Sequence, residues 1–96
     1  MATVVVTPTA VADLDTLIRT LSLPPRTRAR IGASLEPLIK FPLLGAPFEG
    51  RWASFRFLLG PWRWMLMVYV FDEAADRVAV VTIQDARSAV SAMSSP

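Results

Sequence analysis

The spacing of hydrophobic positions changes from strand-like to helix-like within the first part of the chain. Residues Thr3 to Val6 form a short β-branched run that suits a β-strand. Thr7 can then cap a helix with its hydroxyl, and Pro8 can occupy the first helical position, where its missing N–H costs nothing. The pattern therefore predicts a strand that leads directly into a helix.

Two stretches with helical spacing follow, and the segment Ser22-Leu23-Pro24-Pro25 separates them. The second stretch begins near Arg26 and contains Pro37, which cannot donate a backbone hydrogen bond, so we expect a break near Glu36. The apolar positions of the two stretches are Ala10, Leu14, Leu17, Ile18 and Leu21, then Ile31, Leu35, Leu38 and Ile39. Together they predict a helical hairpin.

The second half of the chain is typical of a loop followed by three strands. Residues 42–54 contain several glycines and prolines and are expected to form the loop. The expected strands are residues 54–59, 62–71 and 77–84, joined by a Gly60-Pro61 turn and a polar loop at residues 72–76. The middle strand is almost continuously apolar, which is typical of a central strand covered on both faces.

These elements predict an α+β fold with the order β-α-α-β-β-β. We expect the helical hairpin to pack on one face of a small, mainly antiparallel sheet. The other face would then expose a larger apolar patch than a soluble monomer normally tolerates. A partner chain or a second copy is the natural candidate to cover it.

Composition limits the chemistry available to this chain. Its 96 residues are 53% hydrophobic, which indicates one globular domain over residues 1–87, followed by a small, polar tail at residues 88–96 that we expect to fray. Without cysteine or histidine, the chain can form no disulfide, thiolate nucleophile, Cys/His zinc site or Ser-His-Asp triad. We expect neither a metal nor a cofactor. The amino terminus lacks the pattern of an export signal, and the longest apolar run, residues 64–71, is too short to span a membrane, so a cytoplasmic location is expected.

Charge is distributed unevenly along the sequence. Residues 19–63 carry eight basic and two acidic side chains, whereas residues 72–85 carry one basic and four acidic ones. A basic half suits a polyanionic target or an acidic partner segment, and a solvated basic helix face gives the same count. Arginine strongly outnumbers lysine, which favours bidentate contacts with phosphate or carboxylate groups.

A series of short motifs lies in a fixed order between Val4 and Arg87. They are Thr7-Pro8 with Ala10, Asp13 and Leu14; Leu35, Leu38, Ile39, Phe41-Pro42 and Gly45; Arg56; Gly60-Pro61-Trp62-Arg63; Tyr69; Asp72-Glu73; and Val80-Val81-Thr82-Ile83 with Arg87. In order and spacing this series resembles the RelE/ParE toxin superfamily of type II toxin-antitoxin modules. The resemblance implies a growth-inhibiting toxin that forms a hetero-oligomer with a cognate antitoxin.

The resemblance leaves two branches open. RelE-like members cut mRNA in the ribosome with a basic cluster, and ParE-like members inhibit DNA gyrase without cutting RNA. The nuclease branch implies active arginines at Arg63 and Arg87, and Tyr69 is a further catalytic candidate on the same strand face as Arg63. That branch also implies lysines before Gly60, a basic residue or histidine near position 85 and a tyrosine near position 90, all of which this sequence lacks.

These departures favour a toxin that acts without catalysis as a gyrase inhibitor. The alternatives are a ribosome-dependent endoribonuclease and a non-toxic remnant that only binds an antitoxin. The remaining candidates are Arg51 and Arg56 for nucleic acid or target binding, and Met65, Met67 and Tyr69 for antitoxin binding.

Structural roles compete with these functional ones. If the hairpin places Val70 opposite Val78, Arg63 lies almost opposite Asp85 and can form a cross-strand ion pair with it. Tyr69 can equally be a core or interface aromatic residue. The three tryptophans are expected to anchor the core and a loop.

Overall fold

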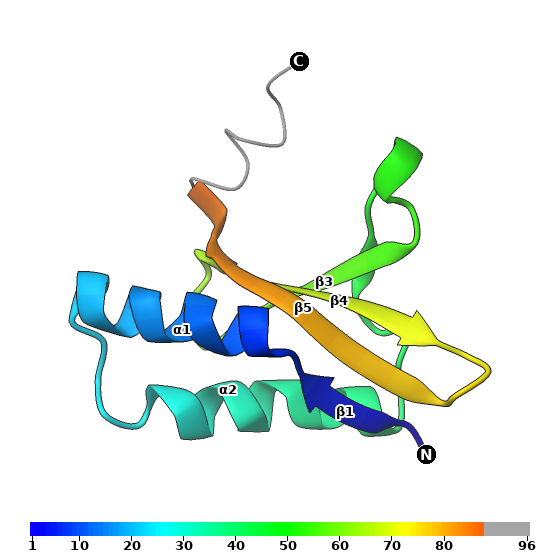
Figure 1. Cartoon of the computed structure of the whole chain (residues 1–96), viewed down its shortest axis with the longest axis horizontal. Coiled ribbons are helices and arrows are strands. Elements are labelled where there is room, and N and C mark those ends of the chain that lie inside the picture. The colour runs from blue at the N-terminus through cyan, green and yellow to red at the C-terminus, as the bar shows by residue number, and fades with distance from the viewer. Residues whose placement is uncertain (88–96) are drawn as a thin grey trace.

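Two helices cover one face of a five-stranded sheet in the computed structural model, which describes residues 1–87 (Figure 1). The predicted α+β class and the order β-α-α-β-β-β are confirmed, and the expected tail lies outside the described residues. The elements are β1 (Thr3–Val6), α1 (Pro8–Leu21), α2 (Thr27–Leu35), β2 (Ala46–Pro47), β3 (Phe55–Leu59), β4 (Met65–Asp72) and β5 (Arg77–Asp85), with 3₁₀ turns η1 (Glu36–Ile39) and η2 (Gly50–Trp52).

The strands lie in the order β1-β5-β4-β3-β2, so β4 is the central strand, as predicted. Only the pairing of β1 with β5 is parallel; the other three are antiparallel. The expectation of a plain loop over residues 42–54 is wrong, because Ala46 and Pro47 pair with Phe57 and Arg56 on β3. A strand of two residues is too short to show an alternating pattern in the sequence.

The start of α1 is tied to the sheet. Thr7 Oγ1 accepts a hydrogen bond from the backbone N–H of Ala10 at 3.3 Å and donates one to the carbonyl of Val80 at 2.8 Å. The predicted cap is therefore present, and it also fixes the helix against β5. At the other end of the hairpin, α2 stops at Leu35 and η1 begins at Glu36, which confirms the break predicted near Glu36.

Two apolar clusters lie on opposite faces of the sheet. The larger one fills the space between sheet and helices, and its buried members include Ala10, Leu14, Ile31, Leu35, Leu38, Met65, Met67, Tyr69, Val78, Val80 and Ile83. The smaller cluster lies on the other face, which we call the open face; it contains Leu66 and Val68 with Phe48, Phe55, Phe57, Val81 and Ala86 packed against them. The described helices leave this face uncovered, as the sequence predicts (Figure 1).

The register between β4 and β5 differs from the prediction. Val70 lies opposite Ala79, one position beyond the expected Val78. A β-bulge between Val68 and Tyr69 shifts the register again, so that Asp85 lies opposite Met65. The predicted pairing of Arg63 with Asp85 is consequently wrong, because a bulge moves every residue beyond it relative to the neighbouring strand.

We expect one carboxylate of α1 to stabilise this irregular part of β5. Asp13 Oδ2 accepts hydrogen bonds from Thr82 Oγ1 at 2.5 Å and from the backbone N–H of Ile83 at 3.4 Å. An Asp13→Ala substitution removes both and should lower the free energy of unfolding by about 1–3 kcal/mol, measured by urea denaturation.

Asp15 on the same helix provides the matched control. Its carboxylate forms an ion pair with Arg28, and both side chains are substantially exposed. Asp15→Ala should cost at most about 1 kcal/mol, because exposed ion pairs contribute little. Equal effects of the two substitutions would show that the contact with β5 is unimportant.

Candidate functional site

Tyr69, a predicted catalytic residue, lies in the core between β4 and the helices and has no exposed surface. Its hydroxyl oxygen accepts a hydrogen bond from the backbone N–H of Gly45 at 2.8 Å. Burial raises the pKa of the phenol, and the Gly45 N–H and the charge of Arg56 oppose this effect. The phenol is therefore neutral at physiological pH and out of reach of an external substrate in this conformation.

Met65 and Met67 lie in the same buried cluster as Tyr69. Both are fully buried in the cluster beneath the helical hairpin. The expectation that they and Tyr69 lie on a surface available to an antitoxin is therefore wrong for this conformation. Alternation along β4 correctly groups the three side chains on one face, but that face is the one the helices cover.

Arg56 is engaged by the chain itself. It lies opposite Tyr69 on β3, and its Nη1 donates hydrogen bonds to the carbonyls of Leu43 at 3.2 Å and Gly45 at 2.8 Å. Tyr69 and Arg56 thus hold residues 43–45 against the sheet from two sides. The structure gives Arg56 a role in fixing this segment.

The single tyrosine of the chain makes this burial directly measurable. Because burial raises its pKa, the folded protein should show phenolate absorbance only at a pH above the ordinary value of about 10, whereas the protein in urea should titrate near that value. The stability from the neutral buried phenol is fully present below the ordinary pKa and is lost as pH rises through the folded value. An ordinary titration curve in the native state would contradict the buried position.

Arg63 and Arg87, the other predicted catalytic residues, lie near the start of β4 and the end of β5. Arg63 is exposed in the turn that precedes β4. It therefore lies outside the strand, whereas the sequence predicts a strand that begins at residue 62. Arg87 forms a bidentate ion pair with Asp85, through Nε to Oδ1 at 2.9 Å and Nη2 to Oδ2 at 2.6 Å. These bonds lower the pKa of Asp85. Of the two arginines, Arg87 is therefore the one that already binds a carboxylate, that of Asp85.

Tryptophan rings connect this region to the helical hairpin. The rings of Trp62 and Trp64 stack with centroids 5.9 Å apart, on either side of Arg63 in the sequence. The guanidinium of Arg30 on α2 lies 4.7 Å from the centroid of Trp62, and that of Arg87 lies 5.4 Å from the centroid of Trp64. This arrangement, which we call the arginine–tryptophan stack, joins α2 to the end of β5. The stack confirms the expected anchoring role of these two tryptophans.

The open face carries a group of aromatic side chains that the described helices do not cover (Figure 1). Phe48 and Phe57 pack with ring centroids 5.0 Å apart, and Trp52 lies 6.0 Å from Phe55 while remaining 43% exposed. The guanidinium of Arg51 lies 5.1 Å from the Trp52 centroid, at the rim of this face. The structure therefore brings Arg51 to an uncovered apolar surface but places Arg56 in other contacts.

Two further features are absent from residues 1–87. No group of three or more acidic side chains in this range is arranged to hold a metal ion. None of the helices described is both long and apolar enough to cross a membrane.

Comparison of the fold with solved structures gives clear similarities, although no protein-family model and no curated protein sequence matches the chain. A chain of the RelBE2 toxin-antitoxin complex from Mycobacterium tuberculosis superimposes with a TM-score of 0.68 and 24% sequence identity, over 88% of this chain and 96% of that one. The conserved hypothetical protein HP0892 from Helicobacter pylori gives a TM-score of 0.62 and 15% identity, over 93% and 99% of the two chains. HP0894 from the same organism gives 0.51 and 14% over 86% and 92%. The predicted resemblance is thus confirmed at the level of the fold.

Proposed function

We propose that this chain is the toxin of a type II toxin-antitoxin module of the RelE/ParE type and is neutralised by a cognate antitoxin. The observation that carries this proposal is the fold shared with a chain of a toxin-antitoxin complex, over almost the whole of both chains. The ordered motifs between Val4 and Arg87 support it independently.

We further propose that the toxin acts by binding a large enzyme, with DNA gyrase as the target, and does not cut RNA. RNA cleavage requires a base within hydrogen-bonding reach of the attacking ribose hydroxyl. Tyr69 is buried, Arg56 is bonded to the carbonyls of the chain and Arg87 is bound to Asp85. Arg63 remains exposed, but a guanidinium is always protonated and cannot serve as a general base.

The open face is the surface that we assign to partner binding. Its aromatic side chains from β3 and the neighbouring loop are covered by no described element, and Arg51 stands at its edge. Apolar centres with exposed tryptophan and arginine are typical of protein interfaces. An amphipathic, acidic antitoxin segment fits this surface, and its association should become slower as salt concentration rises.

Three parallel assays test the proposal with the purified full chain. We expect inhibited DNA supercoiling by gyrase, intact mRNA in a translation extract, and restored supercoiling when the product of the adjacent reading frame is added. Cleaved mRNA with normal supercoiling would identify a ribosome-dependent endoribonuclease instead. Complex formation with that product, but no effect on supercoiling, mRNA or growth, would identify an antitoxin-binding remnant.

A further inference from the structure

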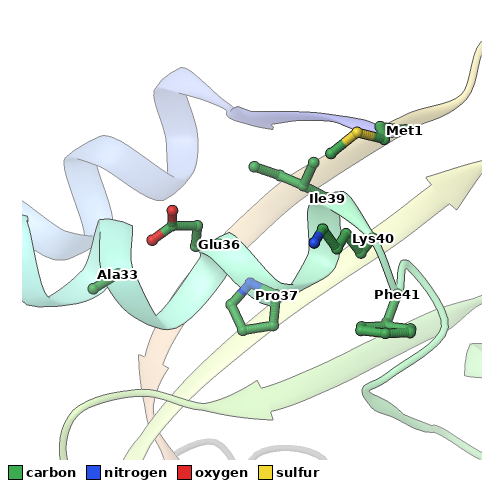
Figure 2. A pocket seen from close by; sticks show the side chains of 7 residues that line it. All are labelled: Met1, Ala33, Glu36, Pro37, Ile39, Lys40 and Phe41. Carbon is green, nitrogen blue, oxygen red and sulfur yellow. The ribbon is translucent and has the colours of Figure 1, made fainter.

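A second exposed apolar surface lies away from the open face, where α2 passes through η1 into the following segment. Phe41, Leu43 and Leu44 are 62%, 57% and 54% exposed. Beside them is a shallow hollow of about 400 Å³, whose lining includes Ala33, Glu36, Pro37, Lys40 and Phe41 (Figure 2). We call these residues the hairpin-end surface.

The exposed side chains of this surface are held on a fixed segment of backbone. The N–H of Gly45 is bound by Tyr69, and the carbonyls of Leu43 and Gly45 are bound by Arg56. The backbone of Phe41 is also fixed, because its N–H donates to the carbonyl of Pro37 at 2.9 Å. An apolar surface that is already ordered loses little conformational entropy when a partner covers it.

The two ends of the hairpin-end surface differ in size. At one end the small side chain of Ala33 is exposed on α2. At the other end the ring of Phe41 projects away from the residues around it (Figure 2). The surface therefore combines a projecting aromatic ring with a part of α2 that carries only a small side chain.

The surface carries one acidic and one basic side chain. Glu36 begins η1 and Lys40 directly follows it; both line the hollow, both are exposed, and neither forms an ion pair within the described part of the chain. A partner with charge of a single sign would leave one of them opposed or unpaired. A second copy of this chain carries both charges at the same spacing, and a two-fold rotation brings each opposite its counterpart.

We propose that the hairpin-end surface is the interface of a symmetric homodimer. In it, Phe41 of each copy packs over Ala33 and Pro37 of the other, and Glu36 of each copy pairs with Lys40 of the other. This dimer leaves the open face free, so it does not depend on the proposed toxin function. A dimeric toxin would present two open faces to its partners.

Charge exchange tests the pairing in the full chain. Sedimentation equilibrium over a range of concentrations should show a monomer–dimer equilibrium for the natural sequence. Glu36→Lys or Lys40→Glu alone places like charges opposite each other and should raise the dissociation constant at least about tenfold. The double variant restores opposite charges and should return the constant to within about threefold of the natural value.

An apolar pair of variants tests the packing. Phe41→Ser should abolish detectable dimer, whereas Leu59→Ser, which changes an exposed leucine on the open-face side of β3, should leave the dissociation constant unchanged. Circular dichroism and urea denaturation of each variant establish that it is folded. A monomer at every accessible concentration overturns the proposal, as does a dimer that survives the single charge reversals or is dissociated by Leu59→Ser.

Discussion

Substituting Gly45 with alanine is expected to lower the free energy of unfolding by about 2–4 kcal/mol. A Cβ at this position would lie 2.6 Å from the carbonyl oxygen of Phe57 and 2.7 Å from Cε1 and Oη of Tyr69. All three atoms belong either to the backbone of β3 or to the fully buried side chain of Tyr69, so none is the free end of an exposed side chain. The segment would have to shift away from the sheet and would lose its hydrogen bond to Tyr69.

Urea denaturation measures this effect, and Gly32→Ala is the matched control. Gly32 lies within α2, and a Cβ there meets no other atom within 4 Å. Alanine should therefore stabilise the helix by about 0.5–1 kcal/mol, because it has less conformational freedom to lose than glycine. The same chemical change should thus have opposite signs at the two positions. A variant with alanine at position 45 and unchanged stability would show that the close approach of this segment to the sheet is not required.

The contrast between these glycines shows what local patterns can predict. The helix start at Thr7, the break at Pro37 and the strands of the second half follow from residues that lie side by side in the sequence, and all are present. Neither the parallel pairing of β1 with β5 nor the bulge near Tyr69 has such a local signal. Both arise from packing between segments far apart in the chain, which sequence periodicity does not report.

The same distinction, between local patterns and packing of distant segments, applies to the residues of the candidate site. Alternation along β4 predicts that Met65, Met67 and Tyr69 share a face, and they do. Which face the helices cover depends on how the hairpin folds back over the sheet, so exposure of these residues could not be derived from their spacing. Two of the tryptophans form a further feature that is only partly visible in the sequence. Trp62 and Trp64 stand on either side of Arg63 in the sequence, but the guanidinium groups that contact their rings come from α2 and from the end of β5.

Arginine count therefore overstates the cationic surface of this protein. Arg56 is bound to backbone carbonyls, Arg87 to Asp85 and Arg28 to Asp15. Each of these groups would have to give up a partner before it could bind a phosphate. A partner that recognises the protein through apolar contacts, with arginine at the rim, fits the observed contacts better than a bare polyanion does.

Trp52→Ala should consequently weaken the complex with the antitoxin by about 2 kcal/mol, or roughly thirtyfold in dissociation constant. Trp52 is 43% exposed and stands between Phe55 and Arg51, so it can bury a large area against a partner without first leaving the core. Truncating it should change the free energy of unfolding far less than it changes binding, since η2 lies outside both buried clusters.

Isothermal titration calorimetry with the product of the adjacent reading frame measures this affinity. Phe41→Ser is the matched control, because it removes an exposed aromatic ring from the hairpin-end surface and leaves the open face intact. If the antitoxin binds the open face, affinity falls with Trp52→Ala and is retained with Phe41→Ser. The reverse result would move the antitoxin to the end of the helical hairpin, where it would compete with the second copy of the chain for the same apolar surface.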